Sequence, residues 1–175
     1  MSIVQRTWAR LLAKPLWAWA GIAMLSVAAV GAALVSQHVF DMQPCPWCTL
    51  QRVIFLAIAG VALMGALWGG PWGQRLTAGL TAALAGSGVA AALWQLMVAS
   101  SSLSCNLTFA DHVLMALHLP SWAPEVFEPR ASCAEASVNL LGLPYAVWSL
   151  ALFVVLAAAA IGLLVRAIRA QARAE

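Results

Sequence analysis

Four long stretches without a charged residue restrict what this 175-residue chain can fold into. A helix crosses about 30 Å of hydrocarbon with about 20 residues, and only helices or closed barrels satisfy every backbone polar group in lipid. Because these stretches are continuously apolar and do not alternate, they indicate helices. We therefore predict an all-α membrane protein whose four transmembrane helices cover residues 16–36, 53–68, 76–99 and 140–165.

The low charge leaves no room for a separate soluble domain. Only 9% of the residues are charged, whereas soluble domains carry about 25%. We expect one membrane domain over residues 1–175, built as a four-helix bundle. The first stretch also has features of a secretory signal peptide, because basic residues precede it and small residues end it. A signal peptide has an apolar region of about 7–15 residues, and 16–35 is longer, so we expect a retained anchor.

Lysine and arginine are distributed unevenly between the segments that join these stretches. Seven of the nine basic residues fall in segments that would share one side of the membrane, namely 1–15, 69–75 and 166–175. The opposite segments, 37–52 and 100–139, hold two basic residues and five of the six acidic ones. Because excess basic charge marks the cytoplasmic face, both termini should be cytoplasmic. In a bacterium this arrangement describes an inner-membrane protein with two periplasmic loops.

All four cysteines fall in the two predicted outer loops. The first loop carries Cys45-Pro46-Trp47-Cys48, and a Cys-x-x-Cys pair is typically redox-labile. The second loop carries Cys105 and Cys133 with 27 residues between them. A purely structural disulfide closing that loop would contribute roughly 3–4 kcal/mol to stability. This role explains the second pair but not the first, because closing a two-residue loop stabilises little. A structural zinc site usually brings its ligands as compact pairs, and only one compact pair exists, so we predict no metal.

The residues after the first pair favour a reactive thiolate at Cys48. Pro44 and Pro46 end the preceding segment, so the next helix should begin near Cys48 or Thr49. The free N–H groups and partial positive charge of a helix N-terminus stabilise a thiolate. Arg52 lies four residues beyond Cys48 on the same face, where it would favour that thiolate and hydrogen-bond a carbonyl oxygen of a bound electron acceptor. The alternative is that Arg52 only extends to the membrane interface.

The second outer loop contains a segment with helical periodicity. Its apolar residues recur at helix spacing at Phe109, Val113, Ala116 and Leu117. This pattern predicts a short interfacial helix lying on the outer membrane surface. Three prolines within residues 120–129 should break any continuation. His112 and His118 lie off the apolar stripe, and the sequence assigns them no role.

Tryptophans near the ends of the predicted spans are typical of an interfacial belt, in which indole rings favour the headgroup level. This interpretation covers Trp17, Trp19, Trp68, Trp72 and Trp148. Trp47 differs from them because it lies inside the Cys-x-x-Cys pair.

Several short motifs occur together in an order that is specific to one family. They are Gln37-His38-Val39, Pro44-Cys45-x-x-Cys48 with Gln51-Arg52, Ser132-Cys133-Ala134-Glu135, Leu141-Gly142-Leu143-Pro144 and Trp148-Ser149-Leu150. In length, number of spans, orientation and cysteine placement, the chain resembles the DsbB family of bacterial disulfide bond formation proteins. The resemblance covers nearly the whole chain, and the residues around Cys105 depart most from the family pattern.

The resemblance implies a protein-dithiol:quinone oxidoreductase that reoxidises a DsbA-like periplasmic thioredoxin-fold protein. By that resemblance Cys105 receives the partner's thiolate. Cys133, its loop partner, exchanges with Cys45, and Cys48 passes the electron pair to ubiquinone or menaquinone. The quinone-binding residues that the resemblance implies are Cys48, Arg52, His38 and Gln51. No nucleic acid partner is expected.

Two other functions stay open at this point. A non-enzymatic four-helix membrane scaffold with structural disulfides would leave both cysteine pairs inert. A transmembrane relay of reducing power would need cysteines within the spans, and this chain has none there. Thiol trapping under a mild reductant distinguishes labile disulfides from inert ones.

Overall fold

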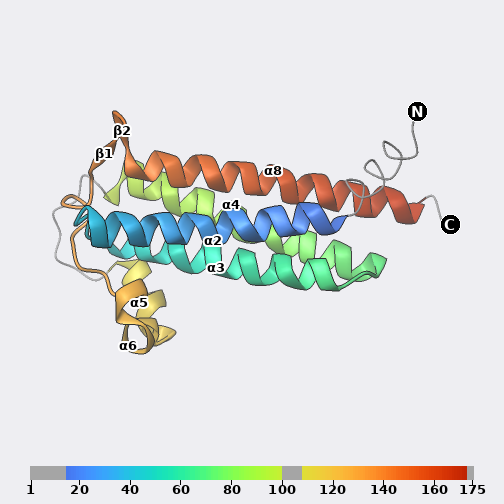
Figure 1. Cartoon of the computed structure of the whole chain (residues 1–175), viewed down its shortest axis with the longest axis horizontal. Helices are drawn as coiled ribbons and strands as arrows, with labels where there is room; N and C mark the ends of the chain where they lie inside the picture. The colour runs from blue at the N-terminus through green and yellow to red at the C-terminus, as the bar shows by residue number, and fades with distance from the viewer. Residues whose placement is uncertain (1–14, 100–107, 173–175) are drawn as a thin grey trace.

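Four long helices lie side by side in the computed structural model, which describes residues 15–99 and 108–172 (Figure 1). They are α2 (Pro15–Val39), α3 (Pro46–Leu67), α4 (Pro71–Met97) and α8 (Tyr145–Ala172). Each is long and apolar enough to cross a membrane. The predicted all-α membrane fold with four spans is therefore confirmed.

The four helices form one bundle in which α2 packs on α3, α3 on α4, and α4 on α8. The start of α2 and the end of α8 lie at the same end of the bundle (Figure 1). The opposite end, where α3 begins and α4 ends, is called the cysteine end below. The helices pack closely against one another. Phe153 of α8 stacks on Phe55 of α3, with ring centroids 4.0 Å apart. A Cβ atom added at Gly88 of α4 would lie only 2.4 Å from the same Phe153 ring.

Helix α3 begins at Pro46, earlier than the predicted start near Cys48 or Thr49. Cys45 is the N-cap residue, and its sulfur accepts a hydrogen bond from the Cys48 backbone N–H. Proline suits the first helical turn because its missing N–H has no partner there and its φ is already helical. Pro46 therefore starts this helix, and most of the segment predicted as the first outer loop is helical.

Helix α8 begins at Tyr145, five residues later than the predicted span. The preceding residues form a two-stranded hairpin of β1 (Asn139–Leu140) and β2 (Leu143–Pro144). Its two turn residues, Leu141 and Gly142, have φ of 55° and 83°, as a tight two-residue hairpin requires. An apolar run alone does not reveal this turn, so the predicted span was too long at its start.

The second outer loop folds into three short helices beside the cysteine end (Figure 1). They are α5 (Phe109–Ala116), α6 (Leu119–Trp122) and α7 (Pro124–Phe127). A capping box between Thr108 and Asp111 starts α5. As predicted, α5 does not continue through the prolines; Pro120 is the second residue of α6, and Pro124 is the first residue of α7. The inner face of α5 uses Ala110 and Leu114, whereas Phe109 is exposed; contact of that exposed face with lipid stays a prediction.

Trp19 is not part of an interfacial belt, which corrects the interpretation from sequence. Its side chain is completely buried, and its indole N–H donates to the Gln74 side-chain oxygen over 2.7 Å. The indole fits there because Gly65 of α3 lacks a side chain, and a Cβ atom added at Gly65 would lie 2.7 Å from the ring. The other four predicted belt tryptophans are exposed in the bundle.

Candidate functional site

The Cys-x-x-Cys pair occupies the N-terminus of α3, as a dithiol. The sulfurs of Cys45 and Cys48 are 3.0 Å apart, and the described cysteines Cys45, Cys48 and Cys133 are free thiols. Cys45 is fully buried, whereas Cys48 is partly accessible. The two thiols therefore differ in surroundings: Cys45 faces the protein interior, and Cys48 is the one that a ligand could reach.

The second outer loop lies directly against the first at the residue before Cys45. The Pro44 carbonyl accepts backbone N–H groups from Arg130 and Ala131 at 2.9 and 3.3 Å. These two bonds bring Cys133, two positions further on, beside Cys45, so that three sulfurs come together. Cys105 lies outside the described residues.

The thiols of Cys45 and Cys133 form a hydrogen-bonded pair between the two loops. Hydrogen bonding to Cys133 and to Cys48, with burial, raises the pKa of Cys45. The hydrogen bond from Cys45 lowers the pKa of Cys133, because a donated hydrogen bond favours the thiolate. Of the two thiols, Cys133 therefore has the lowered pKa, which makes it the better nucleophile while both are reduced.

Charged groups within the second loop fix its own conformation. Arg130 pairs with Glu125 at 3.1 Å and with Glu128 at 3.3 Å, and these carboxylates raise the pKa of Arg130. Beyond Arg130, Glu135 accepts the Ser132 backbone N–H at 2.9 Å and the Ser132 hydroxyl at 2.8 Å. These two bonds lower the pKa of Glu135 and close the turn that carries Cys133.

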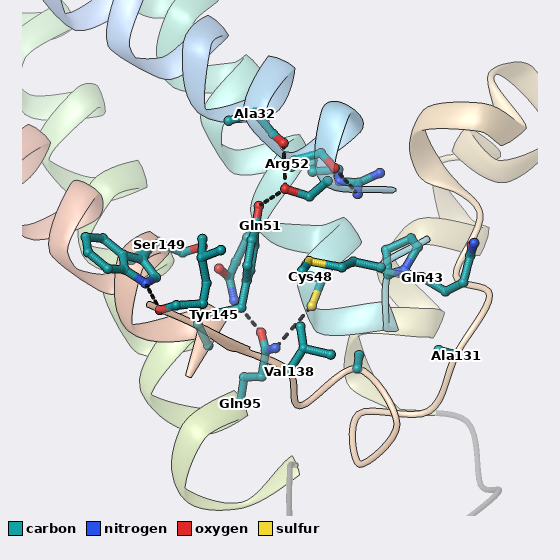
Figure 2. Close-up of a pocket in the computed structure, with 18 of the residues that line it drawn as sticks. Ala32, Gln43, Cys48, Gln51, Arg52, Gln95, Ala131, Val138, Tyr145 and Ser149 are labelled. Atoms are coloured by element: carbon teal, nitrogen blue, oxygen red, sulfur yellow. Dashed lines mark hydrogen bonds between the residues drawn. The ribbon is translucent and has the colours of Figure 1, made fainter. Parts of the chain in front are cut away.

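A cavity of about 680 Å³ opens beside Cys48 at the cysteine end (Figure 2). Its wall is mainly apolar, with contributions from α2, α3 and α8. Apolar lining residues include Ala29, Ala32, Ala33, Phe40, Phe55, Leu140, Ala146, Trp148 and Leu152. Polar lining residues include Ser36, Cys48, Gln51, Arg52, Gln95, Tyr145 and Ser149. A largely apolar cavity with a few polar groups is typical of a site for a small organic ligand.

Arg52 is 5% exposed and lines this cavity. Its Nη1 donates to the Gln37 side-chain oxygen at 2.7 Å and to the Val126 carbonyl at 3.0 Å. Its Nη2 donates to the Ala33 carbonyl at 3.4 Å. The third guanidinium nitrogen, Nε, is buried and has no hydrogen-bond partner among the described residues. Arg52 is one of the charged residues of the cavity wall, and a guanidinium N–H suits an acceptor atom of a ligand there.

Two glutamines connect Cys48 to the neighbouring helix. Gln51 Nε2 donates to Gln95 Oε1 at 2.7 Å, and Gln95 Nε2 donates to the Cys48 sulfur at 3.1 Å. Gln51 is among the residues predicted for the site from the sequence, whereas Gln95 of α4 is not. A signal was present, because Gln95 is a polar residue near the end of an otherwise uncharged span, and such residues are often functional.

Gln37 and His38 are neighbours in sequence with different surroundings. Gln37 is buried, accepts from Arg52 and donates to the Glu125 carbonyl at 3.3 Å. His38 is exposed, with its Nε2 3.8 Å from a Glu125 carboxylate oxygen, and it does not line the cavity. The structure thus brings together Cys48, Gln51 and Arg52 of the expected quinone-binding residues but leaves His38 outside.

No group of three or more metal-ligating side chains is placed to hold an ion within residues 15–99 and 108–172. The polar groups that the site brings together among these residues are thiols, side-chain amides and one guanidinium. Its components come from all four long helices and from both outer loops.

Comparison with known proteins agrees with this arrangement. The model of the family described as disulfide bond formation protein DsbB matches residues 15–163. Disulfide bond formation protein B of Ralstonia nicotianae is 34% identical over 136 residues, covering 78% of this chain and 85% of the relative. Disulfide bond formation protein B 1 of Pseudomonas aeruginosa is 36% identical, with 73% and 81% covered. The protein B of Aromatoleum aromaticum is 33% identical, with 83% and 90% covered. This chain is a multi-pass membrane protein that belongs to the DsbB family of disulfide bond formation proteins.

Proposed function

We propose that this chain is a protein-dithiol:quinone oxidoreductase of the bacterial inner membrane. In this proposal it reoxidises a DsbA-like thioredoxin-fold protein in the periplasm. The observation that carries the proposal is the row of sulfurs from Cys133 through Cys45 to Cys48, which ends at the cavity. DsbA is a strong oxidant at about −120 mV, so its regeneration needs a still better electron acceptor. A lipid-soluble quinone meets that need at the membrane.

The proposed exchange starts from two disulfides, Cys105–Cys133 and Cys45–Cys48. A partner thiolate bonds to Cys105, the Cys105–Cys133 bond breaks, and its electron pair leaves on Cys133. Cys133 then bonds to Cys45, and the electron pair of the broken Cys45–Cys48 bond moves to Cys48. The contact between Cys45 and Cys133 supports this second step.

The cycle closes when the partner's second thiol releases Cys105 and forms the partner's disulfide. Cys105 next bonds to Cys133 again, which frees Cys45 beside Cys48. Re-forming the Cys45–Cys48 bond yields two electrons and two protons, and a quinone in the cavity supplies the acceptor for both.

The residues lining the cavity fit a quinone. Arg52 lines the cavity and brings a guanidinium that can donate to a carbonyl oxygen, Cys48 lies at the polar wall, and the apolar wall suits the ring substituents. The charge distribution of the sequence supports the orientation, because seven of the nine basic residues fall in segments predicted on the side opposite the cysteine-bearing segments. Ubiquinone and menaquinone both have the carbonyl oxygen that this site would bind.

The test follows quinone absorbance in purified protein, with a reduced DsbA-like protein as donor. Cys48→Ser should abolish quinone reduction but still permit capture of the partner, because the lesion lies after the exchange between loops. Cys133→Ala should accumulate a mixed disulfide between Cys105 and the partner, visible on a non-reducing gel. Normal turnover in Cys48→Ser would refute the proposed order. Disulfides that resist mild reductant would instead indicate a structural scaffold.

A further inference from the structure

The sulfur of Cys48 lies in an environment of hydrogen-bond donors that comes from two different helices. The Cys45 thiol lies 3.0 Å away within the same turn. Gln95 Nε2, from α4, lies 3.1 Å away and is directed at the sulfur (Figure 2). Of these two hydrogen bonds to the Cys48 sulfur, only the one from Gln95 remains when Cys45 forms a disulfide with Cys133.

The orientation of the Gln95 amide is determined by its neighbour Gln51. An amide can present either its oxygen or its nitrogen to a sulfur, and the hydrogen-bond network decides between them. Gln51 Nε2 donates to Gln95 Oε1 at 2.7 Å, which leaves Gln95 Nε2 for Cys48. Both glutamines are buried, at 3% and 6% exposure, so water does not readily replace either bond.

A neutral donor directed at a sulfur stabilises the negatively charged form of that sulfur. The effect is larger where the surroundings have a low dielectric constant. In the proposed exchange, Cys48 is the sulfur that receives the electron pair when Cys133 bonds to Cys45. A thiol whose anion is stabilised leaves faster, so the Gln95 contact should accelerate that step.

We propose that Gln95, oriented by Gln51, is a positioning residue that holds Cys48 as a thiolate at the wall of the cavity. Its part in turnover rests on the proposed function, but its contact with Cys48 does not. The other charged or titratable groups that line the same cavity are Asp41, Arg52, Arg130, Glu135 and Tyr145. These groups are unchanged when Gln95 is replaced, so a change in Cys48 reactivity reports on the amide.

The test uses the full chain with Cys48 as its only cysteine, made by replacing Cys45, Cys105 and Cys133 with serine. The rate of alkylation of Cys48 by iodoacetamide and the ultraviolet absorbance of its thiolate are measured at neutral pH. Gln95→Leu should lower the alkylation rate about ten- to a hundredfold, the usual effect of one hydrogen bond to a charged group. Gln95→Glu, which keeps the shape but has no N–H donor when ionised, should also lower it.

Two further variants separate orientation from folding. Gln51→Leu should lower the rate less than Gln95→Leu, because the Gln95 amide then rotates but keeps its donor. Ser87→Ala serves as the control on the same helix, since Ser87 is exposed and bonds to the Leu84 carbonyl. It should leave the alkylation rate unchanged. Thermal melting of each variant in detergent identifies those that are misfolded.

An unchanged alkylation rate and thiolate absorbance in a folded Gln95→Leu protein would overturn the inference. In the chain with all four cysteines, the inference also expects a lower kcat for quinone reduction with little change in the KM for the partner. If the unmodified protein does not reduce quinone but Gln95→Leu still slows alkylation, the proposed function fails while the Gln95 contact stands. If quinone reduction is normal and alkylation is unaffected, the inference about Gln95 fails by itself.

Discussion

Replacing Arg52 with methionine should raise the apparent KM for quinone by about ten- to a hundredfold and should also loosen the second outer loop. The first effect follows from the position of Arg52, which lines the cavity and can donate a hydrogen bond from its guanidinium to a ligand there. A hydrogen bond involving a charged group contributes about 1.5–3 kcal/mol, and about 1.4 kcal/mol corresponds to a tenfold change in affinity.

The second effect follows from the acceptors that Arg52 already serves. Its bonds to the Gln37 side chain and the Val126 carbonyl are 2.7 and 3.0 Å long, and methionine would leave both acceptors without this donor. Val126 belongs to α7, so the variant releases one attachment of the loop that carries Cys133. Arg52→Lys keeps the charge but loses the planar fork, so it should fall between the wild type and Arg52→Met in both respects.

Gln37→Leu is the matched control for the loop. It removes the bonds from Gln37 to Arg52 and to the Glu125 carbonyl but keeps the Arg52 guanidinium at the cavity. Steady-state kinetics with quinone and partner varied separately measures the first effect. The rate of Cys45–Cys133 disulfide formation under mild oxidation, with Cys48 and Cys105 replaced by serine, measures the second.

The expected pattern is specific. Arg52→Met should alter both measurements, whereas Gln37→Leu should alter the disulfide rate and leave the KM for quinone nearly unchanged. If Arg52→Met folds normally and keeps the wild-type quinone KM, then Arg52 serves only to attach the loop and does not bind the quinone.

Two further predictions concern stability and pH. Gly88→Ala should lower the melting temperature, because its Cβ would overlap the Phe153 ring and overpacking costs about 1–3 kcal/mol. Gly86→Ala is the control and should leave the melting temperature unchanged, since nothing lies within 4 Å of a Cβ atom there. Equal melting temperatures for the two variants would contradict this packing. The turn at Cys133 should weaken in acid, because Ser132 lowers the pKa of Glu135 from 4.5. A carboxyl group whose pKa is lowered in the folded state contributes its full stabilisation at a pH above its ordinary, unfolded-state pKa. That stabilisation is lost as the pH falls through the lowered, folded-state pKa. Amide exchange over residues 132–135 should therefore lose protection on acidification, and Glu135→Gln should remove that pH dependence.

The sequence alone determined the number and order of the spans. Long uncharged runs are sufficient for this, because lipid requires that each spanning segment satisfy its own backbone groups. The redox character of Cys45 and Cys48 stays a prediction, which rests on a local property, a two-residue spacing at a helix start. The helix boundaries were less accurate, because the turn at Leu141–Gly142 and the cap at Cys45 depend on backbone conformation that hydropathy does not report.

Only the tertiary structure decided which distant groups meet. Cys45 and Cys133 lie 88 positions apart, and the backbone bonds to Pro44 bring them together. Gln95 reaches Cys48 because α4 packs against α3. Arg52, expected to act beside Cys48, also holds the Val126 carbonyl of the other loop. These contacts join separate helices and loops, so no spacing within one segment encodes them, and the packing of the bundle had to be known to identify them.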